Sequence, residues 1–216
     1  MDPFRLSLAL APLACYLLAL GIINYSRRAT VVAGPRDTLA LGLALAGLVI
    51  VGPMELFMPL SATAFFGPLV WWLLLAFYGL CLLFLMLMER PRLVIYNLDG
   101  AAVRPLLATI AAQIDPDARW AGDSVALPNL GVQLRIEETR PMKSAVLLAN
   151  GDEQSAPGWR TLHDALRRKL ASVDVERNLK GLSLISFSVL AMLYVLYSAA
   201  RDPAAVAQNL AQLLRL

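Results

Sequence analysis

The sequence predicts a membrane α-helical protein with four transmembrane helices and a small inserted α+β domain, made of an antiparallel sheet and two helices. Three observations lead to this expectation. The chain is 58% hydrophobic and 16% charged, whereas soluble domains are about 45–50% apolar and about 25% charged. The excess lies in uncharged blocks of about 20 residues, enough to cross a ~30 Å hydrocarbon core. Residues 89–180, in contrast, carry almost as many acidic as basic side chains and show strand-like and helical apolar patterns.

The four transmembrane helices are expected at about residues 6–25, 38–58, 65–88 and 181–200. The first apolar run is too long for the core of a signal peptide and precedes no clean small-residue cleavage site, so we expect an uncleaved helix. The second helix is rich in small residues. Such residues either let helices approach closely or reflect the ordinary composition of membrane helices. The small residues are Ala40, Gly42, Ala44, Ala46 and Gly47.

Positive charges predict the orientation of these helices. Arg27, Arg28 and Arg36 lie in the short connecting loop 27–37, and cations also begin and end the 89–180 segment. Short loops rich in Lys and Arg stay in the cytoplasm. We therefore expect the N-terminus and the C-terminus outside and the 89–180 domain in the cytoplasm.

The cytoplasmic segment has the pattern strand, helix, four strands, helix. The strands are expected at Leu93–Tyr96, in a hairpin over Arg119–Leu127, over Val132–Ile136 and at Ala145–Ala149. The helices are marked by Val103 to Ile114, with Pro105 at the start of the regular helix, and by Trp159 to Val173. This order favours an antiparallel sheet with both helices on one face.

The tail 201–216 is predicted to form a short amphipathic helix. Val206, Leu210, Leu213 and Leu214 fall on one of its faces. Such a helix either lies on the outer membrane surface or binds a partner.

Glu55 is the strongest candidate for a functional residue. An acidic side chain within a span is costly and indicates function by default, and Pro53 frees a backbone carbonyl beside it. The opposing interpretation is that Glu55 reaches the interface at the helix end, since no other span contains a Lys, Arg or His to pair with it.

Arg167, Arg168 and Lys169 are candidate membrane-surface contacts, because basic side chains are attracted to anionic headgroups; the alternative is a solvated helix face. His163 is the only histidine, and with Asp164 beside it we expect an ordinary surface or boundary residue. Both cysteines fall inside expected spans, so thiols supply no zinc site in the domain. No nucleotide-binding, metalloprotease or nucleophile-elbow motif is found, and we expect no catalytic residue, cofactor or metal.

Two blocks, Arg90–Asn97 (RPRLVIYN) and Asp117–Asp123 (DARWAGD), resemble those of an uncharacterised bacterial multi-pass inner-membrane protein family of similar length. The resemblance covers most of the chain and implies the bacterial inner (plasma) membrane. The family has no assigned activity, so the resemblance implies no functional residue.

The leading hypothesis is a non-catalytic integral membrane protein that acts as a scaffold, assembly factor or accessory subunit. Its partners would be membrane lipids and a membrane protein or further copies of itself; the nearly neutral domain argues against nucleic acid. The alternative is a transporter or channel component that uses the intramembrane carboxylate Glu55. A membrane enzyme acting on lipid ranks last, because no paired acid and base is evident.

Overall fold

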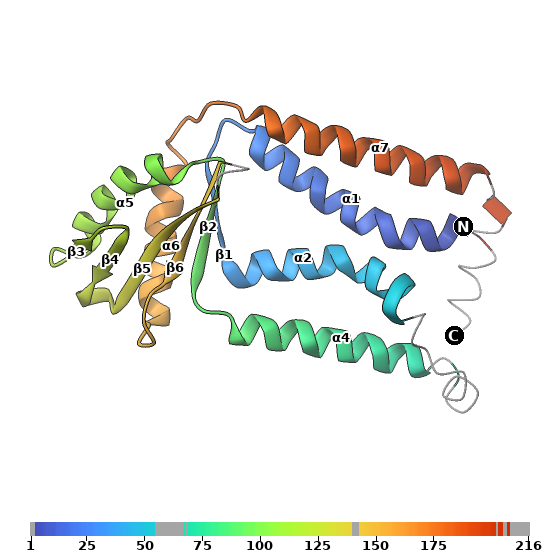
Figure 1. Cartoon of the computed structure of the whole chain (residues 1–216), viewed down its shortest axis with the longest axis horizontal. Helices are drawn as coiled ribbons and strands as arrows, with labels where there is room; N and C mark the ends of the chain where they lie inside the picture. The colour runs from blue at the N-terminus through green and yellow to red at the C-terminus, as the bar shows by residue number, and fades with distance from the viewer. Residues whose placement is uncertain are drawn as a thin grey trace. The chain divides into compact units, whose positions relative to one another are not determined.

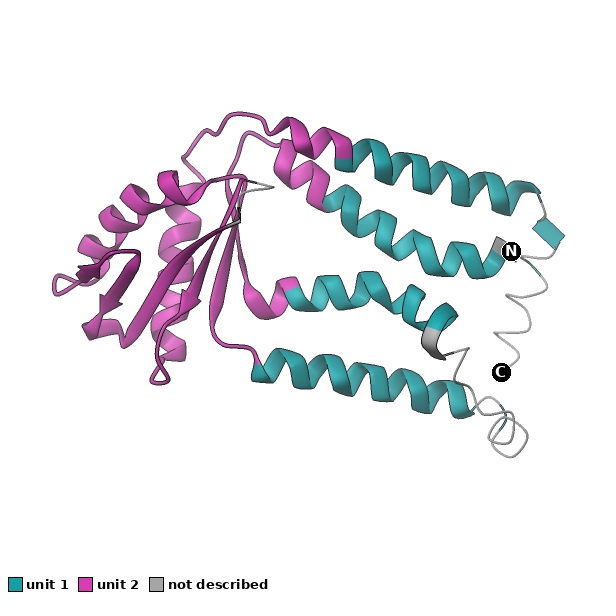
Figure 2. Cartoon of the chain, in the orientation of Figure 1, with its two compact units in different colours: residues 1–19, 38–88, 184–216 teal, residues 20–37, 89–183 magenta. Residues whose placement is uncertain are grey.

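A computed structural model of the chain describes residues 3–54, 67, 69–139, 143–201, 203–204 and 207. Within them lie four apolar helices of membrane-spanning length and a six-stranded antiparallel sheet accompanied by two further α-helices (Figure 1). At this level the predicted fold class is confirmed. Contacts divide the chain into two compact units (Figure 2). Unit 1 comprises residues 1–19, 38–88 and 184–216, and unit 2 comprises residues 20–37 and 89–183.

The long helices are α1 (Pro3–Tyr25), α2 (Gly34–Val49), α4 (Leu69–Met88) and α7 (Leu179–Arg201). The second expected span, 38–58, begins earlier, at Gly34. Pro35 near the helix start and Asp37 in its first turn favour this early beginning. The regular α-helix also ends earlier, because a π-helical turn, η1 (Ile50–Met54), follows Val49. Most of the tail 201–216 lies outside the described residues.

Small residues of α2 pack against neighbouring helices of unit 1. A Cβ atom at Gly47 would lie only 1.9 Å from the carbonyl oxygen of Leu8 in α1, so only glycine fits there. At Gly42 the carbonyl accepts a hydrogen bond from the Tyr78 hydroxyl of α4 at 2.7 Å. The close-packing interpretation of these two glycines is therefore confirmed.

The sheet contains one strand more than the sequence predicted. Its order is β1-β2-β6-β5-β4-β3, and every neighbouring pair is antiparallel. The strands are β1 (Thr30–Ala33), β2 (Arg92–Tyr96), β3 (Arg119–Ala121), β4 (Ser124–Leu127), β5 (Val132–Thr139) and β6 (Ser144–Ala149). The treatment of 27–37 as a plain loop was wrong, because its short apolar run pairs with β2 from 60 residues away.

Polar contacts hold the β1 segment to β2. Asn97, fully buried with φ of +65°, donates from Nδ2 to the Ser26 carbonyl at 2.5 Å. The Tyr96 hydroxyl donates to Asp37 at 2.5 Å. Arg92 contacts Glu89 and lies 3.9 Å from the same Asp37 carboxylate. These contacts tie both ends of β1, and the start of α2, to the edge of the sheet.

The two helices of unit 2 are α5 (Gly100–Ile114) and α6 (Ala156–Leu170). Asp99 caps α5, accepting from the Ala102 N–H, and the regular helix therefore starts before Pro105, contrary to expectation. The helix tolerates Pro105 because Ala101, whose carbonyl loses its usual donor, is exposed to water. The second helix ends at Leu170, three residues before the expected Val173.

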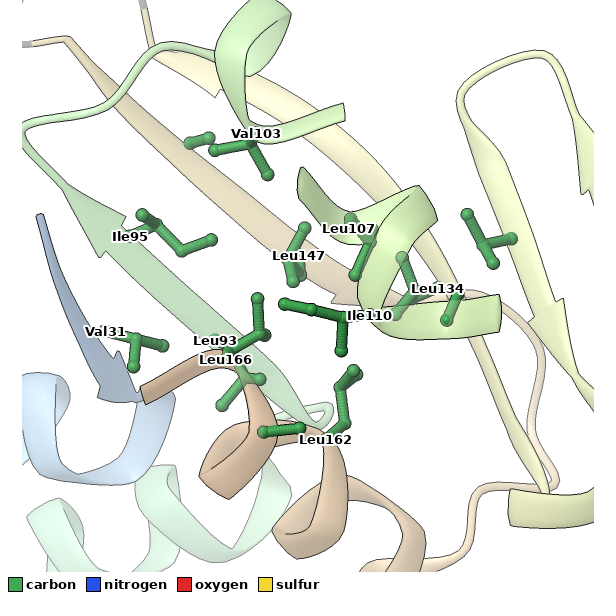
Figure 3. Packing of buried hydrophobic residues seen from close by; sticks show 14 of the residues in the cluster. Val31, Leu93, Ile95, Val103, Leu107, Ile110, Leu134, Leu147, Leu162 and Leu166 are labelled. Carbon is green, nitrogen blue, oxygen red and sulfur yellow. The ribbon is translucent and has the colours of Figure 1, made fainter. Parts of the chain in front are cut away.

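The core of unit 2 lies between one face of the sheet and helices α5 and α6 (Figure 3). Alternate residues of each strand face the helices, in keeping with the two-residue period of a strand. Side chains from both the strands and the helices are completely buried in this core: Ile95, Leu134 and Leu147 from the sheet, and Leu107, Leu162 and Leu166 from α5 and α6. Both helices therefore cover the same face of the sheet.

A pair of substitutions in β1 tests whether this strand belongs to the core. Val31 is 8% exposed and joins the core, whereas Val32 points to the opposite face. Val31→Ala should lower the free energy of unfolding of unit 2 by about 2 kcal/mol, through lost burial and a cavity. Val32→Ala should cost less than half as much. Pulse proteolysis in urea on the detergent-solubilised chain measures both, and equal losses would contradict the assignment.

Candidate functional site

The sequence-predicted site residues occupy separate parts of the chain. Glu55 lies outside the described residues, directly after η1. Arg167, Arg168 and Lys169 form the exposed last turn of α6, where cations interact favourably with the helix dipole. The His163 side chain is 17% exposed, and its Nδ1 lies 3.2 Å from Asp164 Oδ1. The structure thus groups the three cations on one turn and pairs His163 with its own neighbour.

The described residues contain no cluster of metal-ligating side chains. No three His, Cys, Asp or Glu side chains come close enough there to share an ion. Cys15 in α1 and Cys81 in α4 are exposed, and each is a free thiol. Surface hollows of unit 2 are therefore the next candidates for a binding site.

The larger hollow, about 620 Å³, lies beside β4, β5 and the turn 152–155. One of its polar side chains forms three hydrogen bonds within the protein. Gln154 accepts from Trp159 Nε1 at 2.9 Å and from the Gln133 N–H at 3.3 Å, and it donates to the Asn150 carbonyl at 2.9 Å. These bonds close a turn, so this hollow is better explained by structure than by a ligand.

The second hollow, about 450 Å³, lies between α5 and the β3–β4 hairpin, and we call it the Trp120 groove. Trp120 pairs across the ladder with Val125, which is 1% exposed, so both side chains are on the helix-covered face. Trp120 itself is 37% exposed at the margin of the core. An apolar wall dominates the groove, which is lined by Arg104, Pro105, Ala108, Trp120 and Gly122.

The main chain of Trp120 faces outward from the sheet. The Ile136 N–H donates to the Asp123 carbonyl at 2.9 Å. Main-chain groups two residues apart on a strand point the same way, so the N–H and C=O of Leu134 also point toward β4. Val125 is the register partner of Leu134 and bonds toward β5. Because bonding directions alternate along an antiparallel ladder, Trp120 opposite Val125 turns its N–H and C=O away from β4. Among the described residues β3 is the last strand in the order, so these groups form an open edge of the sheet they build.

Arg104 holds the hairpin against α5 and closes one end of the groove. Its guanidinium donates to the Gly122 carbonyl and lies 2.9 Å from the Asp123 carboxylate. Gly122 has φ of +62°, a backbone conformation that suits glycine in a two-residue hairpin. The turn of the hairpin is therefore fixed by its backbone and by one cation.

The other end of the hairpin is anchored by a buried carboxylate. Asp115, which caps the C-terminus of α5, is completely buried. It accepts from the Asn129 N–H at 2.9 Å, from Asn129 Nδ2 at 2.7 Å and from the Asp117 N–H at 3.1 Å. Asn129 belongs to the 3₁₀ turn η2 (Pro128–Leu130) after β4. This network ties the end of α5 to the turn that follows β4, at the end of the hairpin opposite Gly122.

Sequence reasoning did not single out Trp120. The available signal was a tryptophan in a three-residue strand beside a turn, which places a large apolar side chain on an element too short to bury it. Pro105, 15 residues earlier in the sequence, came next to it only through the tertiary fold.

Comparison with known proteins adds no relative. The chain matches no protein-family model, no curated protein and no solved structure.

Removing the Arg104 clamp should loosen the hairpin without unfolding unit 2. In Arg104→Gln, amide hydrogen exchange over residues 119–127 should be faster by about tenfold, because the turn loses its contact with α5. Global stability should change by less than about 1 kcal/mol, since the ion pair is exposed. Arg135→Gln removes a similar exposed pair, with Glu137, and is the control. Equal exchange rates over residues 119–127 in the two variants would contradict the claim that Arg104 holds the hairpin against α5.

Proposed function

We propose that this protein is a non-catalytic, multi-pass membrane protein of the bacterial inner membrane that acts as a scaffold or accessory subunit. In this proposal the four apolar helices span the bilayer, and unit 2 presents the Trp120 groove to a partner protein in the cytoplasm. The partner supplies an extended segment that pairs with the edge of β3 and places an apolar side chain on Trp120.

The observation that carries the proposal is an exposed tryptophan beside an unpaired main-chain edge. An added strand gains affinity from main-chain hydrogen bonds and specificity from a side-chain pocket. Tryptophan is enriched among residues that dominate binding energy. The groove offers both features at one residue, Trp120, on a hairpin anchored at Arg104 and Asp115.

The chain connections support a tethering role. The strand β1 ends at Ala33 and α2 begins at Gly34, while α4 ends at Met88 and β2 begins at Arg92. The sheet is thus joined to candidate membrane spans by almost no linker, so the domain could not travel far from a membrane that held those helices. The β3 edge is the edge of the sheet opposite β1.

Site-specific photo-crosslinking tests this proposal in membranes of the source cell. A benzophenone amino acid replaces Ala121, which is exposed in β3 next to Trp120. We expect one discrete protein adduct, reduced at least about tenfold by Trp120→Ala, because losing such an anchor typically costs 2 kcal/mol or more.

The control places the same probe at Arg135, exposed on β5. Adducts of equal yield at both positions, or an adduct that survives Trp120→Ala, would exclude the groove as the contact surface. Circular dichroism verifies that the variant keeps its fold.

The alternative, a transporter or channel component, retains one supporting observation. The π-helical turn Ile50–Met54 directly precedes Glu55, and π-helical turns occur frequently at functional sites. The docking proposal ranks higher because it rests on contacts that the structure describes.

A flux assay separates the two candidates. Under the docking proposal, proteoliposomes containing the wild-type chain should show no more proton or cation flux than empty vesicles, and Glu55→Gln should leave that value unchanged. A flux that Glu55→Gln reduces tenfold or more would establish transport and overturn the scaffold assignment, since a charge within a span would then act in the pathway.

A further inference from the structure

The chain leaving α1 and the chain entering α7 lie side by side within unit 2. The Val175 N–H donates to the Arg27 carbonyl at 2.9 Å, and Arg28 forms an isolated antiparallel bridge with Asp174. In the first turn of α7, a Cβ atom at Gly181 would lie 2.7 Å from the Tyr25 nitrogen and 2.9 Å from the Gly21 carbonyl oxygen. The two helix ends therefore meet backbone to backbone.

Four exposed cations gather where these segments meet, and we call them the junction cluster: Arg27, Arg28, Arg177 and Lys180. The ion pairs that the structure shows among the described residues include those of Arg90, Arg92, Arg104 and Arg135, and none involves a cation of the junction cluster. The carboxylates nearby in sequence, Asp174 and Glu176, are fewer than the cations. The cluster keeps a net positive charge.

Arg177 is positioned by an aromatic ring instead of a carboxylate. Its guanidinium carbon lies 5.2 Å from the centre of the Tyr25 ring, and its Nη1 lies 3.5 Å from the Tyr25 hydroxyl oxygen. A cation–π contact orients a guanidinium without neutralising it. Arg177 is therefore held in place with its charge available.

The helix ends next to these cations in sequence also carry exposed apolar side chains. Ile22 in α1 is 56% exposed, and Leu179 and Leu182 in α7 are 75% and 48% exposed. Cations next to apolar side chains match an amphiphile, whose phosphate contacts the former and whose acyl chains contact the latter. A free phosphate would use only the cations.

We propose that the junction cluster binds the headgroup of an anionic phospholipid. The ends of α1 and α7 lie at the headgroup level if these candidate spans cross the bilayer. A lipid bridging Arg28 and Arg177 links the two segments that run between the spans and unit 2. This site rests on membrane insertion and is independent of the Trp120 groove.

Native mass spectrometry of the full-length protein in detergent tests the site. The protein is offered equal amounts of phosphatidylglycerol and phosphatidylcholine with identical acyl chains. The wild type should retain phosphatidylglycerol selectively. Each cation removed should weaken retention about fivefold, the effect of ~1 kcal/mol per charge, so Arg28→Gln/Arg177→Gln should lower it more than tenfold.

The matched control is Arg119→Gln/Arg160→Gln, which removes two exposed cations elsewhere in unit 2. Equal losses in the two double variants, or equal retention of both lipids by the wild type, would overturn the proposal. Displacement by millimolar inorganic phosphate at constant ionic strength would also overturn it, in favour of a free-anion site. If the double variant fails to fold, Lys180→Gln alone must still give the fivefold loss.

Discussion

The pairing of β1 with β2 is the constraint on which the rest of unit 2 depends. The four register pairs, from Thr30↔Tyr96 to Ala33↔Leu93, join segments that are some 60 residues apart. Without β1, the outer edge of β2 would expose its main-chain groups, and Leu93 and Ile95 would lose their contact with Val31. The pairing costs loop-closure entropy, which the hydrogen bonds from Asn97 Nδ2 to the Ser26 carbonyl and from the Tyr96 hydroxyl to Asp37 help to offset.

This pairing also decides how the sheet is connected to the long helices. Because α2 follows β1 without a linker and β2 follows α4 closely, the β1 edge of the sheet is the one tied to candidate membrane spans. Helix α5 then carries the chain from β2 past three strands to β3, at the opposite edge. The meander β3 to β6 returns the chain to β2. One edge is thereby used for attachment, and the other is left open at Trp120.

The two proposed contacts use different chemistry at different places in unit 2. The Trp120 groove combines an aromatic side chain with an open strand edge, which suits an extended protein segment. The junction cluster combines a net positive charge with exposed apolar side chains, which suits a phospholipid. The two contacts therefore recognise different classes of partner.

The sequence by itself determined the long apolar helices, because a span needs only length and hydrophobicity, and it determined β2, α5, β3 to β6 and α6, because local periodicity reports which face is buried. For Gly42 and Gly47 it left close packing and ordinary membrane composition both open, and the contacts with Tyr78 and Leu8 decided for packing. The local pattern placed the start of the regular α5 at Pro105, but the Asp99 cap begins it earlier. It placed the end of α6 at Val173, but a turn ends the helix at Leu170.

Only the tertiary structure decided what depends on contacts between distant segments. The run Thr30–Ala33 is too short to be recognised as a strand until β2 pairs with it. Trp120 looks like an ordinary hairpin residue until Pro105 forms the opposite wall of its groove. In the sequence, Arg28 and Arg177 are separate positive charges that only predict orientation. The structure brings them to one place because the ends of α1 and α7 meet. In each case residues far apart in the chain act together, and a sequence pattern reports only neighbours.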